Sequence, residues 1–143
     1  MNATFVGRRH AARLCGWCAL AVLGEIALYV SYRGHDARFH WFTHFFVGSA
    51  AALVVMTALA ARTSRPVSYP LIWPLLGHLV AAVPDFFFQA GVAHRRWMDV
   101  FLGHISSHFT PGRNITWFVV FLAALAGYLI VVDRMRPSKT ART

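Results

Sequence analysis

Charged residues are scarce in this sequence of 143 residues. Asp, Glu, Lys and Arg make up only 13% of the chain, whereas a soluble domain usually devotes about 25% of its residues to them. Apolar residues reach 57%, which excludes a disordered chain and argues against an ordinary water-soluble globule. With only two cysteines, the chain has no disulfide framework either.

Acidic residues are the rarest charged type. Five of them stand against 14 Lys and Arg, which gives a formal net charge of +9. Such an excess occurs in nucleic-acid-binding proteins, but here the basic residues lie between long apolar runs and form no stripe. We therefore expect membrane lipids, and no nucleic acid, as the partners of this protein; its oligomeric state stays open.

Four apolar stretches are long enough to cross a membrane, which takes about 20 residues. They cover residues 14–32, 41–61, 69–88 and 115–132. The sequence thus predicts an all-α fold, a single membrane domain over residues 1–143 built as a bundle of four transmembrane helices. Residues 97–109 are apolar but too few to span, so we expect a short interfacial or re-entrant helix in the outer loop of residues 89–113.

The Lys and Arg residues also predict the orientation. Nine of the 14 lie before the first span, between the second and third spans, or after the fourth. Because basic residues concentrate in cytoplasmic segments, we expect a multi-pass cell-membrane protein with both termini in the cytoplasm. Thirteen of the 14 are arginine, a usage that favours a GC-rich, bacterial source.

Histidine and aspartate gather near the predicted outer side. Six of the eight histidines fall there, together with three aspartates. These residues are His35, His40, His44, His94, His104, His108, Asp36, Asp85 and Asp99. Imidazole and carboxylate groups are the usual protein ligands of zinc, iron and manganese.

Spacing strengthens the metal hypothesis. His40 and His44 are four residues apart, as are His104 and His108, so each pair would share one face of a helix. The alternative is that these are core or interfacial histidines without a metal. The candidate ligands of a divalent ion, with zinc first, are His44, Asp85, His94, Asp99, His104 and His108.

Three ionisable residues lie within or at the end of the first and third predicted spans. Asp85 follows Pro84 at the outer end of the third span, and a carboxylate near hydrocarbon usually has a partner or a function. Glu25 and His78 lie deeper, in the first and third spans. They are expected to pair inside the bundle; a proton relay is the alternative.

Several short motifs resemble those of a known family. Thr43-His44, then Gly77 with Val83-Pro84-Asp85, then His94-Arg95 are similar to motifs of the membrane-bound metal-dependent hydrolases typified by YdjM. The resemblance covers roughly residues 40–110. It implies a multi-span protein with a hydrolytic role and with metal-ligand roles for His44, Asp85 and His94.

The chain departs from that family after Arg95. Where the family has Gly, Thr, His and Ser, this sequence has Arg96, Met98, Asp99 and Val100. Asp99 then stands in the place of an imidazole ligand, and His104 and His108 lie outside the family pattern.

The leading hypothesis is a metal-dependent hydrolase that acts on a lipid-type ester or phosphoester. Asp85 or Asp99 would be the catalytic general base, and Arg95 and Arg96 would bind an anionic substrate group. Two alternatives stay open. One is a haem or di-iron redox protein, with His44 and His78 as haem ligands. The other is a non-catalytic scaffold or partner subunit, for which small residues such as Gly48 to Ala52 permit close helix packing.

Overall fold

The structure is a computed structural model that describes residues 3–32 and 38–135. All regular secondary structure within these residues is helical. In chain order the elements are α1 (Ala3–Tyr32), α2 (Arg38–Thr63), α3 (Ile72–Gln89), the short 3₁₀ helices η1 (Arg96–Val100) and η2 (Ser106–Phe109), and α4 (Asn114–Arg134).

The expected membrane spans are confirmed. Among the described residues, four helical segments are long and apolar enough to cross a membrane. They are Ala11–Ser31, His40–Thr63, Ile72–Gln89 and Asn114–Arg134. The boundaries agree with the predicted ones to within a few residues, because the apolar runs are flanked by polar residues on both sides.

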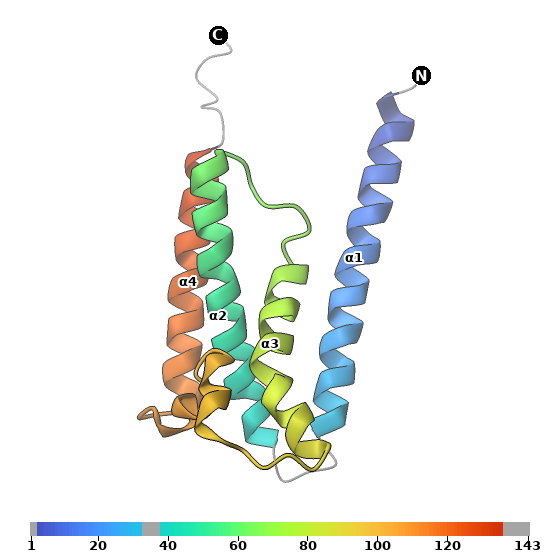
Figure 1. Cartoon of the computed structure of the whole chain (residues 1–143). Coiled ribbons are helices and arrows are strands. Elements are labelled where there is room, and N and C mark those ends of the chain that lie inside the picture. Colours follow the sequence, from blue (N-terminus) through green and yellow to red (C-terminus); the bar gives the residue numbers. More distant parts are fainter. Residues whose placement is uncertain (1–2, 33–37, 136–143) are drawn as a thin grey trace.

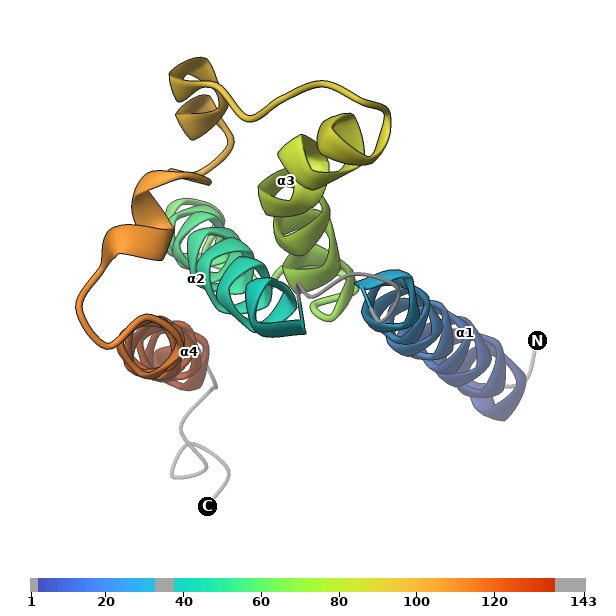
Figure 2. The same cartoon turned by 90° about the horizontal axis from the view of Figure 1, so that it is seen from below.

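Helix α2 is the centre of the bundle. It packs along α3 on one side and along α4 on the other, whereas α1 makes only a few contacts, with α3 and α2 (Figure 2). In Figure 1, α1 begins and α4 ends at the same end of the bundle, and η1 and η2 lie at the opposite end. The α2–α4 contact has an apolar core that includes buried Leu53, Met56 and Tyr128.

Helices α2 and α3 touch through their backbones at Gly48 and Gly77. A Cβ atom on Gly48 would overlap the Gly77 carbonyl and the His78 nitrogen, and one on Gly77 would overlap the Gly48 carbonyl. The small-residue stretch of α2 therefore does allow a close crossing, as the sequence suggested. Because the helices are antiparallel, this crossing sets the start of α2 against the end of α3, which holds Pro84 within it.

The connection between α3 and α4 differs from the single short helix that we expected. It contains two 3₁₀ helices separated by a tight turn, in which Leu102 and Gly103 have positive φ angles of 56° and 69°. Such angles interrupt any right-handed helix. Met98 anchors the segment, because its side chain is fully buried.

Candidate metal centre

Five histidines and one aspartate meet at the end of the bundle that carries η1 and η2. His40 and His44 come from α2, Asp85 from α3, His94 from the α3–η1 connection, and His104 and His108 from the η2 region. We call these six residues the histidine cluster. The structure thus brings together five of the six predicted ligands and adds His40.

Asp85 lies at the centre of the cluster. Its Oδ1 atom is 3.4 Å from His94 Nε2 and 3.2 Å from His104 Nε2, and its Oδ2 atom is 3.1 Å from His44 Nε2. Ligand atoms held about 2.1 Å from a tetrahedral ion lie about 3.4 Å from one another. The spacing around Asp85 therefore matches that of a metal coordination shell.

A backbone hydrogen bond fixes the protonation of His104. Its Nδ1 atom lies 3.0 Å from the Ala81 carbonyl oxygen, which can only accept, so Nδ1 carries a hydrogen. In a neutral ring the Nε2 atom then has a free lone pair. That lone pair faces Asp85 Oδ1 and, at 3.2 Å, His94 Nε2. Either a bound cation or the N–H of a neutral His94 ring can satisfy these electron-rich atoms.

His44 is buried deeply within the cluster, with 1% of its surface exposed. Although its Nε2 atom lies close to Asp85 Oδ2, the contact lacks hydrogen-bond geometry, and this buried nitrogen has no hydrogen bond within the described part of the chain. Its ring stacks on that of His104, with centroids 4.5 Å apart and planes 6° apart. A buried nitrogen that faces a carboxylate without a hydrogen bond suits a metal ligand.

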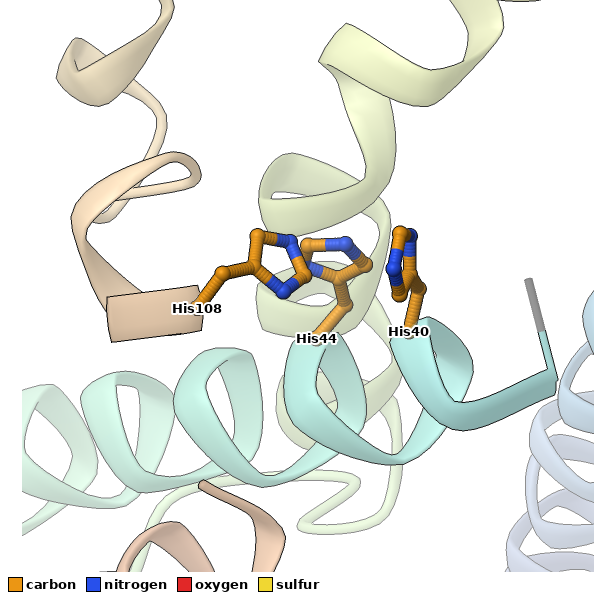
Figure 3. Close-up of side chains that lie close together, drawn as sticks. All are labelled: His40, His44 and His108. Atoms are coloured by element: carbon orange, nitrogen blue, oxygen red, sulfur yellow. The ribbon is translucent and has the colours of Figure 1, made fainter. Parts of the chain in front are cut away.

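His40 and His108 extend the cluster on the other side of His44. Their ring centroids are 4.5 Å apart, and that of His108 is 5.2 Å from the His44 ring (Figure 3). Burial, followed by the nearby imidazoles of His44, His40 and His104, lowers the pKa of His108 to about 4. The ring is consequently neutral at pH 7, the form that binds metals. His40 was absent from our candidate ligands, although its spacing from His44 was the available signal.

Two overlapping groups within the cluster could hold a metal ion. One consists of His40, His44 and His108, and the other of His44, Asp85 and His104. In each group the ligand atoms lie within 4.8 Å of one another.

Asp99 is not brought together with the cluster. Its Oδ1 atom accepts hydrogen bonds from the backbone nitrogens of Ile105 and Ser106, at 2.6 and 2.9 Å. The carboxylate thus caps the first turn of η2, in the manner of a helix N-cap. It holds the backbone that carries His104 and His108.

The cluster reaches the surface of the bundle through His94. Its side chain is 35% exposed, and its ring stacks on Phe88 with centroids 4.9 Å apart. Arg95 and Arg96, which follow in the chain, are exposed. The predicted outer residues His35 and Asp36 lie outside the described residues.

Glu25 and His78 do pair inside the bundle. His78 Nδ1 lies 2.6 Å from Glu25 Oε2, and the His78 ring is fully buried. This contact joins the loosely packed α1 to α3. The structure places His78 here and His44 in the histidine cluster, so the two rings belong to separate polar sites.

An apolar cavity of about 710 Å³ lies between α1 and α4. Glu25, Tyr29, Trp41 and Phe45 are among the side chains that line it, and no member of the histidine cluster is among them. On α2, Trp41 and Phe45 occupy a different helix face from His40 and His44. The cavity is thus separate from the cluster.

Fold and site together define a class: a four-helix protein that fits a membrane, with buried histidine and aspartate groups able to hold a metal ion. No family model matches the chain, and no curated protein or solved structure proves similar to it.

Proposed function

We propose that this protein is a membrane-embedded, metal-dependent hydrolase whose substrate is a lipid-type ester or phosphoester. The observation that supports this most directly is the convergence of Asp85 Oδ1, His94 Nε2 and His104 Nε2 within 3.2 to 3.4 Å, with His104 Nδ1 committed to a backbone carbonyl. Metal-bound histidines usually donate a hydrogen bond to such a group from the N–H of their other ring nitrogen. Zinc is the first candidate, since imidazole and carboxylate oxygen are among its common ligands.

When bound, such an ion lowers the pKa of its water to about 7, which supplies hydroxide for attack on an ester or phosphoester. Residues of the chain would provide access to the site and bind the substrate. A substrate would reach the site past His94, because the side chain of His94 is partly exposed at the surface of the bundle. Arg95 and Arg96 stand beside it in the chain and suit an anionic group through bidentate hydrogen bonds.

The two carboxylates do not contribute equally to this proposal. Asp99 is occupied by two backbone N–H groups, so we assign it the positioning of η2, whereas Asp85 is assigned the role of a metal ligand, and a bound ion would itself activate the water. We infer a lipid substrate from the position of the site relative to the membrane-spanning segments. His44 and Asp85 lie within two of the segments suited to cross a membrane, close to their ends.

Metal analysis of the detergent-purified full chain tests the proposal. After equilibration with Zn²⁺ and removal of free ion, we expect at least one zinc per chain. Asp85→Ala and His104→Ala should lose bound zinc, and His10→Ala, near the start of α1, should keep it. Release of fatty acid or phosphate from lipid micelles should fall about 100-fold or more with either cluster variant or with a chelator.

Two results would overturn the proposal. Wild-type protein without stoichiometric metal would remove the metal site. Metal-loaded protein that hydrolyses neither carboxylic nor phosphoric esters in micelles would remove the hydrolase activity.

A further inference from the structure

The histidine cluster separates into two ligand sets on either side of the Asp85 carboxylate. One oxygen, Oδ1, faces His94 and His104, at 3.4 and 3.2 Å. The other oxygen, Oδ2, faces His44 at 3.1 Å. The two oxygens of Asp85 therefore face different imidazoles.

The second group has three imidazoles, none of which belongs to the first group. His40 and His44 lie one turn apart on α2, and His108 approaches from η2 (Figure 3). Their ligand atoms lie within 4.8 Å of one another. The rings of His40 and His108 are 4.5 Å apart at their centroids. Three imidazoles that converge in this way are a common zinc ligand set.

We propose that the cluster is a dinuclear metal centre in which the Asp85 carboxylate bridges two divalent ions. Oδ1, His94 and His104 hold the first ion, and Oδ2, His40, His44 and His108 hold the second. In known two-metal sites the ions are about 3.5–4 Å apart, a separation that one bridging carboxylate can span. This inference rests on the proposed function and adds the second ion to it.

The two proposed metal sites differ in the number of coordination positions that the protein leaves free. The second ion has four protein ligands, which closes a tetrahedral site, whereas the first has three and keeps one position for water or substrate. Water or substrate would reach the first ion past His94, the member of the first set that reaches the surface, because His104 is only 2% exposed. We therefore assign the reaction to the first ion, and to the second the neutralisation of charge and the orientation of Asp85.

The number of ions per chain tests this inference. Full-length protein in detergent, equilibrated with Zn²⁺ alone, should bind two zinc ions per chain. His108→Ala and His40→Gln should each reduce the content to one, whereas His10→Ala should keep two. In Co²⁺-loaded wild type, the paramagnetic resonance signal per ion should fall as the second equivalent binds, because ions bridged by a carboxylate couple magnetically.

The possible results separate the two proposals. One zinc per chain that is lost in His104→Ala but unchanged in both His108→Ala and His40→Gln would overturn the dinuclear centre and leave the proposed function standing. No zinc in the wild type would overturn both. If His108→Ala aggregates, His40→Gln and the cobalt titration of the wild type decide the matter.

Discussion

Asp85 and Asp99 are carboxylates near the same end of the bundle, and their surroundings give them different roles. Asp85 lies among three imidazole nitrogens, which need a cation or protons to balance their lone pairs. Asp99 accepts two backbone N–H groups, a purely structural use of the same functional group. Residue type alone does not separate these roles, whereas the identity of the neighbouring atoms does.

Replacement of Asp99 distinguishes a capping carboxylate from a ligand or a base. In Asp99→Asn the amide oxygen can still accept both N–H groups, so stability and zinc content should stay close to those of the wild type. In Asp99→Ala the cap is lost, which should cost about 1 kcal/mol. Thermal unfolding in detergent and zinc content at saturating Zn²⁺ measure both effects. Loss of bound metal in a folded Asp99→Asn variant would return Asp99 to the ligand set.

The members of the histidine cluster could be predicted from the sequence better than their arrangement. Paired histidines four residues apart, and a carboxylate beside Pro84, identified most of the cluster, because ligand chemistry depends on residue type. The hydrogen bond between His104 and the Ala81 carbonyl could not be predicted from the sequence, because the backbone of any residue could supply that oxygen. The capping role of Asp99 could not be predicted either, because it depends on where the turn places the backbone N–H groups.

At the scale of secondary structure, the crossing of α2 and α3 positions the site. Gly48 lies one turn after His44, and Gly77 lies two turns before Asp85 on the antiparallel helix. Close backbone contact at these glycines brings the two side chains within reach of each other. The sequence indicated a small-residue face on α2, but the helix that would pack on it depends on three-dimensional contacts.

Gly48→Ala tests the importance of this crossing. The added Cβ would meet backbone atoms of Gly77 and His78, which cannot move aside as a flexible side chain can. We expect a loss of about 1–3 kcal/mol in stability and weaker zinc binding as the helices separate. Gly127→Ala in α4 is the matched control, because its Cβ would meet nothing within 4 Å. Chemical unfolding in detergent compares the two; equal stability would contradict the argument.

At the scale of the whole molecule, the start of α1 and the end of α4 lie at one end of the bundle, and η1 and η2 lie at the other end (Figure 1). The histidine cluster lies at the end that carries η1 and η2. The number of spans was predictable because long apolar runs have few alternatives to crossing a membrane. Which side faces the cytoplasm follows only from the distribution of Lys and Arg. By the order of the spans, nine of the 14 basic residues lie on the side of the bundle opposite to the cluster. Because basic residues concentrate in cytoplasmic segments, we propose that the cluster faces outward.

Single cysteines in two loops test this orientation. After Cys15→Ser and Cys18→Ser, Val92→Cys reports on the α3–η1 connection and Ser68→Cys on the α2–α3 connection; both positions are exposed. In intact cells a membrane-impermeant maleimide should label Val92→Cys at once and Ser68→Cys only after permeabilisation, because basic segments are retained in the cytoplasm. The opposite labelling would place the histidine cluster on the cytoplasmic side. The lipid substrate of the proposed hydrolase would then come from the inner leaflet, while the proposed metal site at Asp85 would be unaffected.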